Sequence, residues 1–189
     1  MKKPLLFSTA LIALDQAVKL IIFHLCPAAD TVILPGVLFF RPVQNTDLSW
    51  IANMADYQAP VWLMVCLQIL FLALVLVVYR YLVYFSENQK AYANGFLIFC
   101  LAGIICSFID VVFWGGSLDF IRLLDWFTFD LKDVYLTVCI ACVLPYAFSY
   151  LRTYRNTTAE ERKEQGVWRW IKKGCPVSRS GLSDKPHEN

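Results

Sequence analysis

Four long apolar segments constrain this chain more than any other feature of its sequence. They run from Leu5 to Leu25, Ala59 to Phe85, Ala93 to Trp114 and Val134 to Leu151. A helix of roughly 20 apolar residues crosses a bilayer core about 30 Å thick, and these segments are long enough to do so. Because 58% of the residues are hydrophobic and only 17% are charged, we expect an all-α membrane protein with four transmembrane helices.

Positive charge is divided unevenly between the two sides of this predicted bundle. One side carries only Arg41, Arg122 and Lys132. The other side carries Lys2, Lys3, Arg80, Lys90, Arg152, Arg155, Arg162, Lys163, Arg169, Lys172, Lys173, Arg179 and Lys185. Short loops rich in Lys and Arg stay in the cytoplasm, so both termini are expected there. The net charge of +2 then reflects topology and attraction to anionic membrane lipid, and we expect no nucleic-acid partner.

The segment between the first two spans has the character of a small β structure. Within about residues 31–50, two β-rich runs, Val32 to Leu34 and Val37 to Phe40, are separated by the turn dipeptide Pro35-Gly36. This predicts a small extracytoplasmic β segment attached to a membrane domain of residues 1–152.

We expect residues 153–189 to form a basic cytoplasmic tail. Thr158 and Glu161 have the spacing of a capping box, which predicts a helix ending at Lys173. Trp168 and Trp170 lie beside basic residues in it, so we expect an interfacial helix resting on the inner leaflet.

The seven cysteines do not have the spacing of a metal site. Five lie in the apolar spans, where we expect them to pack as small hydrophobic side chains: Cys66, Cys100, Cys106, Cys139 and Cys142. We therefore predict no metal site.

Several ionisable residues fall within the spans, where each costs at least about 2.5 kcal/mol and needs a partner or a function. Asp15 and Lys19 are four residues apart, so they share one helix face and can form an ion pair. Gly103, Ser107 and Asp110 also share one face, which is expected to point toward other helices.

Asp119 and Asp133 are expected at the outer membrane edge. If their carboxyl groups lie close together, both cannot ionise easily, and the two titrate as one unit. An aspartyl peptidase needs such a pair, in which one carboxylate takes a proton from water while the neutral partner polarises the scissile carbonyl. Acidic residues are also common at helix ends, so a purely structural role is the alternative.

Four sequence blocks, in order, resemble the lipoprotein signal peptidase (signal peptidase II) family from about Leu11 to Tyr146. They are Leu14 to Lys19, Ile33 to Gly36 with Gln44 to Thr46, Gly103 to Asp110 followed nine residues later by Asp119 to Ile121, and Phe129 to Asp133. The resemblance implies that Asp119 and Asp133 are catalytic. It also implies that Asp110, Asn45, Asp15, Lys19, Ser107 and Asp130 support the site or the substrate.

The chain also departs from the family pattern. Ser107 and Asp130 stand where Asn is usual, Val111 where Arg is usual, Asp47 where Gly is usual and Lys132 where Ala is usual. These changes leave both acids of the pair in place but alter their surroundings.

The resemblance implies an intramembrane aspartyl endopeptidase in the bacterial cytoplasmic (inner) membrane. Its substrates would be diacylglyceryl-modified prolipoproteins, cleaved just before the lipidated cysteine, and the chemistry would require no cofactor. Globomycin-type compounds would inhibit it. One alternative is a catalytically impaired homologue that binds lipidated peptides as a non-enzymatic membrane factor. Another is a proton or ion relay through Asp15, Lys19 and Asp110.

Overall fold

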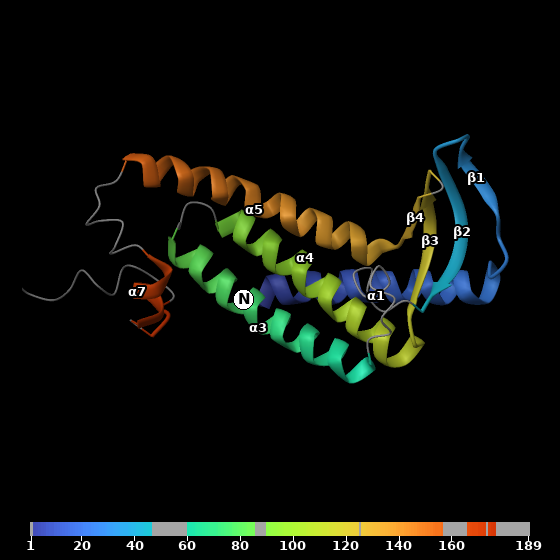
Figure 1. Ribbon diagram of the computed structural model, residues 1–189, viewed down its shortest axis with the longest axis horizontal. Coiled ribbons are helices and arrows are strands. Elements are labelled where there is room, and N and C mark those ends of the chain that lie inside the picture. The colour runs from blue at the N-terminus through green and yellow to red at the C-terminus, as the bar shows by residue number, and fades with distance from the viewer. Residues whose placement is uncertain are drawn as a thin grey trace, which may run out of the picture.

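Four long helices run along the molecule in the computed structural model, which describes residues 2–46, 60–85, 90–124, 126–156, 166–172 and 174–176 (Figure 1). They are α1 (Lys2–Leu25), α3 (Val61–Phe85), α4 (Lys90–Ile109) and α5 (Leu131–Asn156). By length and composition, four helices in the described part of the chain can cross a membrane, which confirms the predicted architecture. Helix α5 continues past residue 152, the predicted boundary between membrane domain and tail, without a break.

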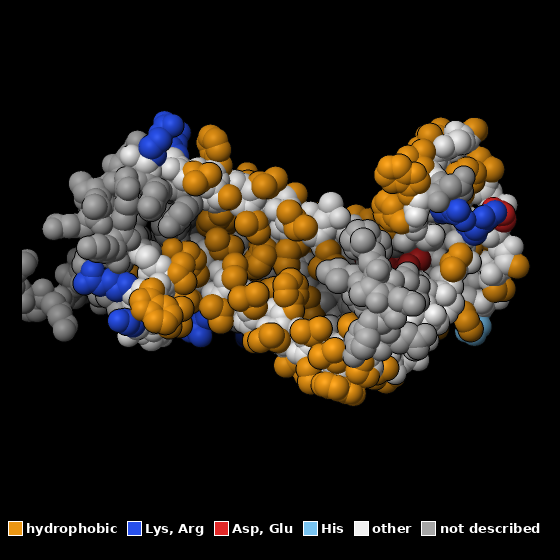
Figure 2. Space-filling view, in the orientation of Figure 1, with side chains coloured by type: hydrophobic (Ala, Val, Ile, Leu, Met, Phe, Trp, Pro, Cys, Tyr) orange, Lys and Arg blue, Asp and Glu red, His pale blue; other side chains and the backbone are white. Residues whose placement is uncertain are grey.

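Helix α4 lies at the centre of the bundle and packs against α1, α3 and α5. In the most apolar 18-residue stretch of each helix, 56% is buried in α4 but only 6% in α3. Most of the surface of α3 is therefore left for contact with lipid. The main core consists of residues from α3, α4 and α5: Val75, Tyr79, Leu82, Ala93, Phe96, Leu97, Cys100, Leu101, Ile104, Cys139 and Tyr146. Apolar side chains cover the outer helix surfaces in Figure 2, as expected of a protein surrounded by lipid.

The interface between α4 and α5 differs from expectation in one respect. Cys100 and Cys139 form a disulfide, with their Cα atoms 5.5 Å apart, instead of packing as separate thiols. Both cysteines lie where the two helices approach closely. A Cβ on Gly103 would come within 2.6 Å of the Leu136 side chain, so a residue without a side chain permits this approach.

A four-stranded antiparallel sheet stands at one end of the bundle (Figure 1). Its strands, in spatial order, are β1 (Thr31–Leu34), β2 (Leu38–Asn45), β3 (Ser117–Leu123) and β4 (Phe127–Phe129). The β segment was predicted from the first two runs alone, whereas β3 and β4 come from the connection between the third and fourth predicted spans, for which no strand was predicted. Leu118 and Phe120 of β3 pack against Ile22, which fixes the sheet on the end of α1.

The tail is described over one short helix, α7 (Val167–Lys172), and the expected start of a longer helix at Thr158 lies outside the described residues. Trp170 is only 2% exposed, because its ring packs against Tyr81 and Tyr84 of α3. Trp168 is 72% exposed. The expectation that both tryptophans rest on the membrane surface is therefore wrong for Trp170.

Candidate active site

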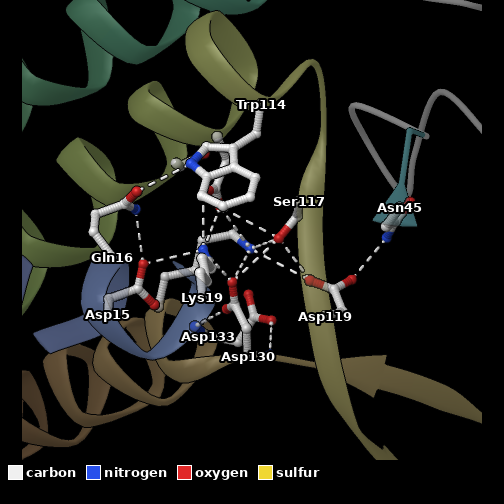
Figure 3. A network of polar contacts seen from close by, with 12 residues as sticks. Asp15, Gln16, Lys19, Asn45, Trp114, Ser117, Asp119, Asp130 and Asp133 are labelled. Atoms are coloured by element: carbon white, nitrogen blue, oxygen red, sulfur yellow. Dashed lines mark hydrogen bonds and ion pairs between the residues drawn. The ribbon is translucent and has the colours of Figure 1, made fainter. Parts of the chain in front are cut away.

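A buried lysine holds three acids together at the sheet end of the bundle. Asp15, Lys19 and Ile22 follow one another at spacings of four and three, and all three side chains are buried on the inner face of α1. The Lys19 ammonium lies 3.0 Å from Asp15, 2.7 Å from Asp110 and 2.6 Å from Asp130 (Figure 3). The predicted pair of Asp15 and Lys19 is confirmed as part of a larger network that joins α1, α4 and the start of α5.

A change in helix geometry places Asp110 in this network. At Asp110 the α4 helix passes into a single π-helical turn, η2 (Asp110–Trp114), a type of distortion that is frequent at functional sites. Gly115 ends the turn with φ of 65°, a left-handed conformation that glycine adopts without strain. A Cβ on Gly116 would lie 2.4 Å from the Asn45 carbonyl oxygen, so the chain can enter β3 here only because this residue lacks one.

Hydrogen bonds hold Asp119 from two directions. Asn45 of β2 donates from its side-chain amide to one carboxylate oxygen at 2.9 Å, and Ser117 donates to the other at 2.6 Å. Asn45 pairs with Ser117, and Val43 pairs with Asp119, in the register of β2 with β3. The position of this acid, which is 4% exposed, is therefore set by strand pairing between segments far apart in the sequence.

The first turn of α5 brings Asp130 and Asp133 together. The backbone N–H of Asp133 donates to Asp130 at 3.3 Å, and the backbone N–H of Asp130 donates to Asp133 at 3.2 Å. This is the reciprocal pattern of a capping box, built here from two aspartates at a helix start, where negative charge is favoured. Carboxylate oxygens of Asp119, Asp130 and Asp133 all lie within 4.8 Å of one another.

A second lysine, Lys132, reaches into the same group from α5. Its ammonium lies 2.7 Å from Asp130, 3.3 Å from Asp110 and 3.6 Å from Asp119, and it donates to Ser117. Burial alone would raise the pKa of Asp130, but the ammonium groups of Lys132 and Lys19 outweigh that effect and hold this pKa below its usual value.

The three acids Asp119, Asp130 and Asp133 are also close enough for one ligand atom from each to hold a cation. Lys132 already contacts two of the three, however, so the chain itself supplies positive charge at this position. The arrangement of Asp119 and Asp133 provides what acid–base hydrolysis needs, namely two carboxyl groups close enough to share protons.

The structure brings together all but one of the residues predicted for the site. The exception is Ser107, whose hydroxyl accepts a hydrogen bond from Gln68 of α3 at 3.0 Å. Ser107 therefore contacts α3, whereas Asp110 pairs with Lys19 of α1, so the two residues meet different neighbouring helices.

Sequence reasoning missed several residues of the network. The Ser117 hydroxyl lies within hydrogen-bond distance of Asp110, Asp119 and Asp130. The one sequence signal for this residue is its position directly after Gly115-Gly116. The sequence analysis noted Lys132 as an outer positive charge and as a departure from the family pattern, but not as a member of the site. Gln16 bonds to Asp15 at 3.0 Å and accepts from Trp114 at 3.1 Å, which links α1 to η2 (Figure 3).

The sheet projects beyond the helices and leaves a hollow between itself and α5. In Figure 2 this hollow opens on the side of the molecule, and acidic side-chain atoms are visible at the foot of the sheet. Most of the lysine and arginine side chains visible in this view gather at the other end, which carries α7. The acids are thus at the end away from most of the positive charge.

Comparison with known proteins agrees with this architecture. Two solved structures of bacterial membrane enzymes, both obtained by the in meso method, are similar to this chain. One has 19% identity and a TM-score of 0.62 over 78% of this chain and 93% of its own. The other has 18% identity and a TM-score of 0.52 over 84% and 93%. At these identities the likeness concerns the fold alone, and the comparison with curated proteins gives no match.

The family comparison is more specific. The family model for signal peptidase (SPase) II matches residues 7–149, which include both spans and strands and every acid of the network. The match extends over much more than half of the 189 residues. This chain therefore belongs to the signal peptidase II family of membrane peptidases.

Proposed function

We propose that this protein is an aspartyl endopeptidase that removes signal peptides from lipid-modified bacterial prolipoproteins by cleaving just before the diacylglyceryl cysteine. The observation that carries the proposal is the approach of Asp119 and Asp133 within 4.8 Å at the sheet end of the bundle. Family membership supports the peptidase activity, and the four apolar helices support its location in the bacterial cytoplasmic membrane.

The proposed reaction uses one acid of the pair as a base and the other as an acid. The ionised carboxylate takes a proton from a water molecule whose oxygen bonds to the scissile carbonyl carbon, while the neutral carboxyl donates to the carbonyl oxygen. The C–N bond then breaks as a proton passes to the leaving nitrogen. The products are a signal peptide with a free carboxyl group and a lipoprotein with a free amino group on its lipidated cysteine.

The other polar residues are proposed to hold this pair in place. Asn45 fixes one oxygen of Asp119, and Asp130 receives the backbone N–H of Asp133. Lys19, with Asp15 and Asp110, anchors the base of the site between the helices. No role at the reacting bond is proposed for Ser107, because it contacts α3 instead.

The direction of the chain in the membrane follows from its charge. We propose that both termini and α7 are cytoplasmic, since most of the described Lys and Arg side chains visible in Figure 2 lie at the end that carries α7. The dyad and the sheet then face outward, where the cleavage site of an exported prolipoprotein emerges. The hollow beside the sheet is the proposed place for the substrate, and globomycin-type inhibitors are expected to compete for it.

The direct test is cleavage of a diacylglyceryl prolipoprotein by the purified chain in lipid, followed on a gel. Asp119→Asn and Asp133→Asn should each reduce turnover by about 10⁴-fold, the order seen when one member of a catalytic unit is lost. The double variant should lose little more, because the two groups act as one. Asp30→Asn, an exposed acid on the outer side, is the matched control and should keep full activity.

Two outcomes would contradict the assignment. Cleavage by folded Asp119→Asn or Asp133→Asn at close to the normal rate would exclude the dyad. Binding of lipidated peptide without any cleavage by the unmodified chain would support the alternative, a non-enzymatic membrane factor.

A further inference from the structure

Ser117 lies within the acidic network, where its hydroxyl meets more groups than it can donate to. Its oxygen is within hydrogen-bond distance of Asp119, Asp130 and Asp110, at 2.6, 3.1 and 3.3 Å. The Lys132 ammonium donates to the same oxygen. A hydroxyl has one proton to donate, so the surroundings decide which of the three carboxyl groups receives it.

The ion pairs of the network identify Asp119 as the acceptor. The Lys19 ammonium lies 2.6 and 2.7 Å from the oxygens that the other two acids turn toward Ser117. Lys132 lies 2.7 and 3.3 Å from the same two oxygens, but 3.6 Å from the facing oxygen of Asp119. Of the three acids, Asp119 thus has the shortest contact with the hydroxyl and the weakest contact with ammonium groups. The Ser117 proton is therefore directed to Asp119.

The strand register brings a second donor to the same carboxyl group. Asn45 of β2 donates to the other oxygen of Asp119 at 2.9 Å (Figure 3). It pairs with Ser117 of β3, and Asp119 follows two residues later on that strand. Opposite residues in a sheet, and residues two apart on one strand, lie on the same face. Both oxygens of Asp119 are therefore held from one face of the sheet.

We propose that Ser117 is a positioning residue of the peptidase site, whose hydroxyl acts with the Asn45 amide to fix the plane of the Asp119 carboxyl group relative to Asp133. A carboxyl group held at one oxygen can still turn, because rotation about its last side-chain bond is only weakly restricted. Hydrogen bonds to both oxygens stop that rotation, so the two acids of the dyad keep the geometry in which they act on one water molecule. The proposal rests on the proposed peptidase function and adds a residue to its machinery.

The experiment measures kcat and KM separately for prolipoprotein cleavage by the full chain in lipid. Ser117→Ala should lower kcat by about 10- to 100-fold, because a small misplacement of a reacting group has an effect of this order. KM should change by less than about twofold, since Ser117 acts on Asp119 and not on the substrate. Ser117→Thr keeps the hydroxyl and should retain most of the rate. The matched control is Ser8→Ala, which removes a buried hydroxyl bonded to Pro4 and Ile98 and should leave kcat unchanged.

A second comparison shows whether Ser117 acts through Asp119. In Asp119→Asn the acid that the hydroxyl positions is gone, so adding Ser117→Ala should lower the residual rate by less than about twofold. A residue that only stabilises the fold would lower the rate by the same factor in both backgrounds. If Ser117→Ala does not fold, Ser117→Cys fills nearly the same space with a much weaker donor and should show the same loss of kcat.

The outcomes separate this proposal from the one on which it rests. If folded Ser117→Ala or Ser117→Cys cleaves with kcat within about twofold of the unmodified chain, the positioning role is wrong and the peptidase assignment stands. Equal losses in the unmodified and Asp119→Asn backgrounds, or a Ser117→Thr protein as slow as Ser117→Ala, would also overturn that role. No cleavage by the unmodified chain would instead overturn the peptidase assignment.

Discussion

Replacing Lys19 by Met tests whether the ion network holds the bundle together. Lys19 is fully buried and pairs with three acids that are also buried. When the ammonium is removed, water therefore cannot reach these carboxylates to replace the lost charge interaction. The penalty is not three times that of a single pair, because Lys132 still contacts Asp110 and Asp130. Asp15 alone loses its recorded cation. We therefore expect the cost of one stranded buried charge, about 3–5 kcal/mol of unfolding free energy.

The assay is unfolding in lipid bicelles by titration with a denaturing detergent, followed by tryptophan fluorescence. Asp15→Asn combined with Lys19→Met should restore much of the loss, since a neutral amide in place of the stranded carboxylate removes the charge that costs most. Arg41→Met is the matched control. It breaks an ion pair with Asp30 on the exposed sheet edge, where such pairs contribute about 1 kcal/mol or less.

The loss should also depend on pH in a defined direction. Lys19 helps to lower the pKa of Asp130, and an acid with a lowered pKa adds stability above its unfolded value, about 3.9, and loses it as pH falls through its folded value. The difference between Lys19→Met and the unmodified chain should therefore be greatest near neutral pH and shrink in acid. Equal stability of the two proteins at neutral pH, or equal losses in Lys19→Met and Arg41→Met, would refute the reasoning.

Two further predictions concern packing. Gly103→Val should cost about 1–3 kcal/mol in the same assay, because its side chain would overlap Leu136, and Leu136→Ala should relieve much of that cost; an unchanged stability would mean that α4 and α5 do not approach this closely. Trp170→Ala should speed tryptic cleavage of the tail by removing its contact with Tyr81 and Tyr84 while leaving prolipoprotein turnover unchanged. A loss of turnover would show that the tail acts on the distant site.

The local pattern of the sequence was enough to find the frame of the site. A sufficiently long run of apolar residues predicts a membrane span, because its side chains can contact lipid and its backbone is hydrogen-bonded within the helix without any tertiary partner. The spacing of Asp15 and Lys19 likewise fixes a shared helix face, and the pair is found as predicted. The sequence placed Asp119 and Asp133 on the same side of the membrane but left their distance open, and the structure brings their carboxylate oxygens within 4.8 Å of each other.

What the sequence alone determined about this protein is therefore the set of spans, the division of charge and the residues that must be paired inside the membrane. The tertiary structure decided the rest. β3 exists because it pairs with β2, a contact across more than seventy residues that no local pattern encodes. Ser107 contacts α3 and Asp110 contacts Lys19 of α1, because the helices that folding packs around α4 decide which neighbour each side chain meets. The contacts of the Lys132 side chain are with Asp110, Asp119 and Asp130, which come from separate parts of the chain. Only folding brings these carboxylates close enough to attract the ammonium group.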